Sequence, residues 1–312
     1  MRRASVLVVL ALALVTGCGS EAAPVTPSAS PETVTSGRVA PSRAPTPTRA
    51  SPRPSSTEDL VIAVPAPTPA PGTAAPAPAP GGQVEGSDRL TSLRGDTRSA
   101  IVWAPLSDPS AVQVEGSVPS HRAWSTSKVL VVAAYLDTVV DGDPSKIPAT
   151  ERGWIRAALT RSDGNAVVAI RDRIPGSPGA AITNVLRAIG DGTTTAPDRS
   201  QGTMSWSPRE QVRFMAALAG GRVVSAQASR YLLGEMNPIP AHEWGLGTIG
   251  AGAFKGGWLT PSSETRQMGI VGGYAVAIIT VGVGPAVVQT DGDSAHVWQM
   301  NRLADLLARR LG

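Results

Sequence analysis

The distribution of aromatic and proline residues divides the chain into two parts with different folding capacity. None of the twelve aromatic residues precedes Trp103, whereas 15 of the 28 prolines fall between Glu21 and Glu85. A segment rich in Pro, Ala, Ser and Thr and free of aromatics buries too little apolar area to offset the entropy lost on folding. The other part, residues 86–312, is long enough for one sizeable domain, and a single cysteine excludes a disulfide framework.

Residues 1–17 have the pattern of an export signal. Two arginines follow Met1, and the apolar run Val6–Val15 is shorter than the roughly 20 residues that span a bilayer. The run ends in Thr16-Gly17-Cys18, which resembles a bacterial lipobox, in which the cysteine carries acyl chains such as palmitate. The alternative is an ordinary signal peptide with an unrelated cysteine. Because this is the only cysteine, we favour lipidation of Cys18 and anchoring to membrane lipid.

Residues 18–85 are then a disordered tether between the lipid and the folded domain. Their proline-rich stretches favour extended polyproline-type conformations. The predicted location is the extracytoplasmic face of the cell membrane. The net charge of +4, most of it carried by arginine, fits an anionic cell envelope, and we expect no nucleic-acid partner.

The hydrophobic pattern of residues 86–312 predicts an α+β domain. Strands are expected near both ends and helices between them, with an all-helical lobe over about 124–248. This order predicts an antiparallel sheet made by both ends of the domain, with flanking helices. The expected strands are 98–104, 111–115, 253–258, 267–271 and 275–283. The expected helices are 125–139, 151–160, 166–173, 180–189, 208–218, 225–235 and 294–311.

Lysine is rare in this chain, with three lysines among 28 basic residues. Arginine does not lose its proton in proteins, whereas a buried lysine does, so the lysine positions suggest chemistry. Lys128 belongs to Ser125-Thr126-Ser127-Lys128, which places the lysine beside Ser125 one helical turn later. A desolvated lysine has a lowered pKa and accepts the proton of a serine hydroxyl. Chance survival on the surface is the alternative for each lysine, and we keep it for Lys146.

Two further motifs follow in order. Ser162-Asp163-Gly164-Asn165 lies in a turn between two predicted helices, and Lys255-Gly256-Gly257 lies on a predicted strand. With Ser125–Lys128, they resemble the S-x-x-K, S-D-N and K-T-G motifs of class A β-lactamases and penicillin-binding D,D-peptidases. The resemblance extends from about residue 95 to the end and implies a β-lactamase/transpeptidase-like fold.

The resemblance also implies a role for each matching position. Ser125 is the acylated nucleophile, Lys128 its base partner and Ser162 a proton relay to the leaving group. Lys255 supports Ser162 and attracts a substrate carboxylate. The remaining implied positions bind substrate: Asn165, Gly257, Arg266, and Trp258 or Leu259, whose backbone N–H completes an oxyanion hole with that of Ser125. For Arg266, a solvated charge on the strand is an equal alternative.

Three departures weaken the resemblance. Gly164 occupies the position of the family's asparagine, so that Asn165 comes one residue late, and Gly256 replaces a hydroxyl residue. The Ω-loop glutamate that activates the deacylating water is missing. Asp198 is the only carboxylate in the corresponding stretch, 193–204, and is either a replacement base or a solvated loop residue.

These observations favour a serine hydrolase that forms an acyl-enzyme at Ser125 on a peptide, amide or ester, with poor β-lactam turnover. A cell-wall peptide is a candidate partner. The alternative is a catalytically degenerate binding module of the same fold. His121, His242 and His296 are far apart in sequence and lack the spacing of a metal site, so we expect no metal and no cofactor.

Overall fold

The computed structural model describes residues 89–258, 264–283 and 294–312. The predicted signal peptide, Cys18, the whole of the predicted tether and Leu259 lie outside the described residues. Within the described part of the chain, no helix combines the length and the apolar character needed to cross a bilayer.

Five strands form one antiparallel sheet. They are β1 (Ser99–Pro105), β2 (Gln113–Ser117), β3 (Ala253–Trp258), β4 (Thr265–Val271) and β5 (Tyr274–Thr280). The spatial order is β2-β1-β5-β4-β3, so the first strand of the domain pairs with the last one. In that pairing Ile101 lies opposite Ile278. The two ends of the domain therefore build the sheet together.

The helices between β2 and β3 form the helical lobe. The α-helices are α1 (Ser127–Thr138), α2 (Ala149–Thr160), α3 (Gly164–Arg171), α4 (Pro178–Ala188), α5 (Pro208–Ala219) and α6 (Ala226–Glu235). Short 3₁₀ turns are η2 (Trp124–Thr126), η3 (Pro144–Lys146), η4 (Gln201–Thr203), η5 (Pro240–His242) and η6 (Gly245–Ile249). The last helix, α7 (Ser294–Leu311), follows β5.

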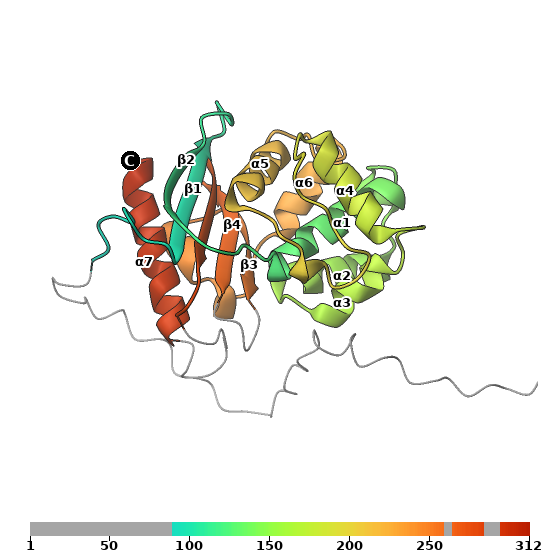
Figure 1. Ribbon diagram of the computed structural model, residues 1–312. Helices are drawn as coiled ribbons and strands as arrows, with labels where there is room; N and C mark the ends of the chain where they lie inside the picture. The colour runs from blue at the N-terminus through green and yellow to red at the C-terminus, as the bar shows by residue number, and fades with distance from the viewer. Residues whose placement is uncertain (1–88, 259–263, 284–293) are drawn as a thin grey trace, which may run out of the picture. The chain divides into compact units, whose positions relative to one another are not determined.

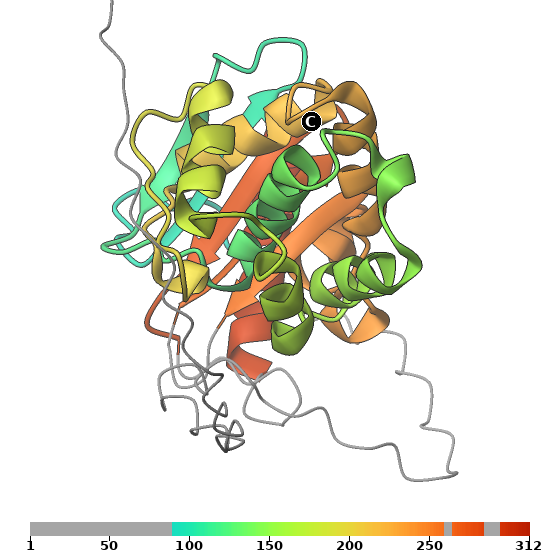
Figure 2. The ribbon, with the colours of Figure 1, turned by 90° about the vertical axis from the view of Figure 1, so that its right-hand side faces the viewer.

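The helices lie on both faces of the sheet. Helix α7 covers one face and the helical lobe lies on the other, with α5 against β5, β1 and β4 (Figure 1). Helix α1 runs through the middle of the lobe, and the other helices surround it (Figure 2). Residues 127–136 of α1 are all buried, which explains why this helix is apolar on most faces.

Each face of the sheet has its own core. One core joins α1, α5 and the other lobe helices to residues such as Met268 and Ala277. The second core lies between the sheet and α7, where Leu303, Leu306 and Leu307 are fully buried. The site described below lies on the lobe side of the sheet.

The predicted architecture is confirmed: an antiparallel sheet from both ends of the domain, flanking helices and an inserted helical lobe. The strand boundaries differ most at β5, which ends at Thr280 rather than at 283, and at β2, which begins at Gln113 rather than at the predicted residue 111. The turn before it is longer than expected, because Asp108 accepts hydrogen bonds from the backbone N–H and hydroxyl of Ser110 and its carbonyl accepts one from Ala111. Helix α1 also begins later than predicted, at Ser127 rather than at residue 125.

Candidate active site

Ser125 lies in the 3₁₀ turn η2, and the α-helix begins only at Ser127. The predicted single helix over 125–139 is therefore wrong at its first turn. Trp124 has a positive φ of 43°, a backbone conformation that non-glycine residues adopt rarely and that occurs often at functional sites. The turn nevertheless keeps the expected contact, because Lys128 Nζ lies 2.8 Å from Ser125 Oγ.

The turn that carries Ser125 is held by its own polar groups and by β3. Thr126 Oγ1 donates to the carbonyl of Ala123, and the Ala123 N–H donates to the carbonyl of Met204 at 2.9 Å. A Cβ at Gly257 would lie 2.9 Å from the carbonyl oxygen of Ala123 and 3.1 Å from the backbone nitrogen of Ser125. Glycine at this position therefore lets β3 approach the nucleophile turn closely.

Ser162 and Lys255 form the second pair of the site. Ser162 lies between α2 and α3 with a positive φ of 60°, and Lys255 Nζ donates a hydrogen bond to its hydroxyl oxygen. Lys255 Nζ also donates to the carbonyl of Gly256 at 2.9 Å. The Ser162–Lys255 contact therefore joins the helical lobe to β3, whereas the Ser125–Lys128 contact lies within the lobe.

Both lysines are buried and their pKa values are lowered. Burial lowers the pKa of Lys128 to about 8, and the negative charge of Asp163 opposes this shift. Burial also holds the pKa of Lys255 well below its ordinary value, and the charge of Lys128 lowers it further. In its neutral form, Lys128 is able to accept the hydroxyl proton across the 2.8 Å contact with Ser125.

A cavity of about 190 Å³ opens beside the nucleophile. Ser125, Lys128 and Trp258 are among its lining residues. The rest of the lining, which the sequence did not reveal, comes from η2, α1, α3 and the segment around η4. It consists of Trp124, Ser127, Val131, Val167, Val168, Arg171, Ser200, Gln201, Gly202 and Thr203.

Asn165 does not line this cavity. Its side chain is exposed in the first turn of α3, because the helix begins at Gly164 with Asp163 as N-cap. The Asp163 carboxylate accepts a hydrogen bond from the Ala166 N–H at 2.9 Å, which fixes the register of the turn. Asn165 comes one residue later than the asparagine of the motif that it resembles, and its side-chain amide is not part of the cavity lining.

Asp198 is absent from the cavity lining as well. It is exposed, and its carboxylate accepts hydrogen bonds from the Ser177 hydroxyl and the Gly179 N–H. The Ser177 hydrogen bond is the main cause of its lowered pKa. Asp198 thus supports the first turn of α4, and no carboxylate is among the residues that line the cavity.

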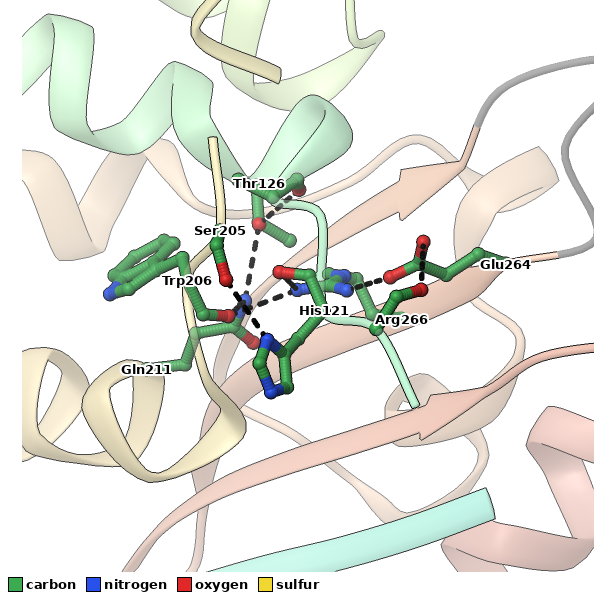
Figure 3. Close-up of polar contacts among 9 residues, drawn as sticks. His121, Thr126, Ser205, Trp206, Gln211, Glu264 and Arg266 are labelled. Carbon is green, nitrogen blue, oxygen red and sulfur yellow. Dashed lines mark hydrogen bonds and ion pairs between the residues drawn. The ribbon is translucent and has the colours of Figure 1, made fainter. Parts of the chain in front are cut away.

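Arg266 is completely buried, so the interpretation as a solvated strand charge is wrong. Its guanidinium forms an ion pair with Glu264 and donates to the carbonyls of His121 and Trp206 at 3.0 and 3.1 Å (Figure 3). Burial lowers its pKa to about 10, although Glu264 opposes the shift. These contacts connect β4 to the segments on either side of the nucleophile turn, and Arg266 is not among the cavity-lining residues.

The described residues contain no group of three or more His, Cys, Asp or Glu side chains arranged to hold a metal ion. His242 is buried against the Trp258 ring, with ring centroids 5.0 Å apart. Burial, with the nearby charge of Lys255, lowers the pKa of His242 to about 4.

Replacement of Arg266 by methionine tests its structural role. We expect the free energy of unfolding to fall by about 3–5 kcal/mol, because the substitution breaks the buried ion pair with Glu264. The control Arg213→Met breaks a surface pair with Glu210 and should cost at most about 1 kcal/mol. Urea denaturation measures both. An Arg266→Met protein as stable as the Arg213→Met protein would show that the buried pair does not support the fold.

No family model and no curated protein sequence matches the chain. Several solved structures match the chain in fold. A β-lactamase from Chitinophaga pinensis superposes with a TM-score of 0.54 at 16% identity, over 69% of this chain and 94% of that one. The extended-spectrum β-lactamase TLA-3 gives 0.53 at 14% identity, over 72% and 94%. The protein PBP-A gives 0.50 at 17% identity, over 68% and 90%. The described chain therefore has the β-lactamase/transpeptidase fold.

Proposed function

We propose that this chain is a serine hydrolase that forms an acyl-enzyme at Ser125. The observation that carries the proposal is the 2.8 Å contact between Ser125 Oγ and the buried amine of Lys128. With a pKa of about 8, roughly a tenth of Lys128 is neutral at pH 7. A purely binding surface has no need of a desolvated lysine beside a serine, so this pair favours catalysis.

The proposed reaction uses both serine–lysine pairs. Neutral Lys128 takes the hydroxyl proton while Ser125 Oγ attacks the carbonyl carbon of a peptide, amide or ester. The backbone N–H groups of Ser125 and Trp258 stabilise the oxyanion. Ser162 gives its hydroxyl proton to the leaving group and regains one from the ammonium group of Lys255 along their hydrogen bond, and the acyl group stays on Ser125 as an ester.

Hydrolysis of that ester is expected to be slow for β-lactams. The cavity lining contains no carboxylate to activate a water, and Asp198 is engaged at the start of α4. These features, with the exposed Asn165, favour the second candidate, a binding module of the same fold that recognises a peptide without turnover. A cell-wall peptide is a candidate ligand for either function.

Covalent labelling of Ser125 tests the proposal. A fluorescent penicillin or a fluorophosphonate should label the protein but not Ser125→Ala, and the penicillin label should persist without recovery. Lys128→Arg should label about 100-fold more slowly or not at all, because the guanidinium keeps its proton. The matched control is Lys146→Arg, whose lysine is exposed and paired with Asp141, and it should label normally.

The outcome that contradicts the enzyme proposal is an absence of Ser125-dependent labelling with either probe. Unchanged labelling of Lys128→Arg would remove Lys128 from the role of base. If neither probe labels Ser125, a binding module of the same fold becomes the better proposal for the function.

We further propose that the chain is a lipoprotein, anchored through Cys18 at the extracytoplasmic face of the membrane. The lipobox-like sequence at the only cysteine supports this proposal. Mass spectrometry of the mature protein should find an N-terminal Cys18 carrying acyl chains, and Cys18→Ala should release the protein from the membrane fraction. An unmodified N-terminus downstream of Cys18 would contradict the anchor.

A further inference from the structure

The cavity beside Ser125 has an apolar character that the proposed chemistry does not require. Three valines from two helices face it, Val131 of α1 with Val167 and Val168 of α3. Val131 follows Lys128 by three residues, so it lies on the same face of α1. The volume of about 190 Å³ exceeds the roughly 150 Å³ that holds benzene in an engineered apolar cavity. The space is therefore sufficient for a hydrocarbon group of six or more carbons.

Three polar side chains of the cavity wall already have partners, whereas the buried Nε1 of Trp124 has none among the described residues. Ser127 Oγ donates to the carbonyl of Trp124 at 2.7 Å, and Thr203 Oγ1 donates to the carbonyl of Ser200 at 2.9 Å. Gln201 Nε2 donates to the carbonyls of Pro197 and Asp198 at 3.1 and 2.7 Å. These donors are not available to organise a polar ligand.

The one cation of the wall besides Lys128 is also paired. The Arg171 guanidinium donates to the carboxylate of Asp172 at 3.0 and 2.9 Å, and the residue is buried. With this charge matched, the valines determine what the cavity accepts, because an apolar ligand gains by leaving water whereas a polar one loses its hydration.

The cavity lies on the acyl side of the nucleophile. Its lining includes Ser125 and Lys128, whereas Ser162 and Lys255 are not among the lining residues. A leaving group protonated by Ser162 departs toward the Ser162–Lys255 pair. The acyl part of the same substrate then extends in the other direction, into the cavity.

We propose that the cavity is an acyl-binding pocket, and that the substrates are esters or amides of apolar carboxylic acids with about six to eight carbons. The proposal rests on the function proposed above. For an ester, Ser125 Oγ forms a bond to the acyl carbon and its proton passes to Lys128. The bond from that carbon to the alcohol oxygen breaks, and the alcohol leaves with a proton. Water then cleaves the acyl-enzyme, releasing the acid and restoring Ser125, so that one ester and one water give one acid and one alcohol.

A series of p-nitrophenyl esters from acetate to dodecanoate tests the pocket. The value of kcat/KM should rise by about fourfold for each added methylene until the pocket is full, near the hexanoate or octanoate. Longer chains should gain nothing more. Active-site titration with a fluorophosphonate normalises each rate to the Ser125 that reacts.

Two substitutions of Val168 should move the preference in opposite directions. Val168→Phe fills the pocket and should lower the octanoate-to-acetate ratio of kcat/KM at least tenfold, whereas Val168→Ala should shift the optimum to a longer chain. The control Val114→Phe makes the same change on the exposed edge strand β2 and should leave the ratio unchanged.

The two proposals fail in different ways. A protein labelled at Ser125 whose kcat/KM does not depend on chain length overturns the acyl pocket and leaves the hydrolase intact. Absence of Ser125 labelling overturns both. If Val168→Phe does not fold, the chain-length profile of the native protein and the shift in Val168→Ala still decide the question.

Discussion

The burial of two lysines in one site is the constraint on which the rest of the structure depends. Lys128 is 5% exposed and Lys255 is 2% exposed, and the charge of one lowers the pKa of the other. Burying an ammonium group is unfavourable unless the group loses its proton or gains hydrogen bonds. Each lysine is hydrogen-bonded to a serine hydroxyl, Lys128 to Ser125 and Lys255 to Ser162. The hydrogen bonds that offset the burial of the two amines are therefore made with the two serines of the proposed reaction.

The surroundings of Ser125 are arranged to keep this contact. The glycine at 257 lets β3 approach the turn, and the Arg266–Glu264 pair ties β4 to the carbonyls of His121 and Trp206. These supports come from strands far from Ser125 in the sequence. The nucleophile itself stands on a 3₁₀ turn after Trp124, whose φ is positive, rather than inside a regular helix.

Much of the fold followed from local patterns, and the site followed only in part. A long apolar run predicted α1 and helical spacing of apolar residues predicted α7, because both patterns are local properties of the chain. The order of the elements predicted the sheet. The burial of Arg266 could not be read from the sequence, because it depends on strands and turns that meet only in the folded chain. The same holds for the cavity, whose valines look like ordinary core residues of separate helices.

The chain shares its fold with β-lactamases, but the residues around the nucleophile fit the proposed acyl-binding pocket better than rapid turnover of β-lactams. An apolar cavity without a carboxylate lies where the nucleophile, α3 and the η4 segment meet. Desolvation is the main cause of the low pKa of Lys128, which shares this mostly apolar cavity wall. We therefore attribute the apolar character of the pocket and the lowered pKa of Lys128 to the same local burial.

The most direct test of this account is the titration of Lys128 itself. A protein labelled with ¹³Cε-lysine has three lysine signals, and comparison with Lys128→Arg identifies the one that belongs to Lys128. The account predicts that this signal titrates with a midpoint near pH 8 in the native protein. A midpoint near 10.5, the ordinary value for lysine, would show that Lys128 has almost no neutral form at pH 7 and would contradict its role as the base.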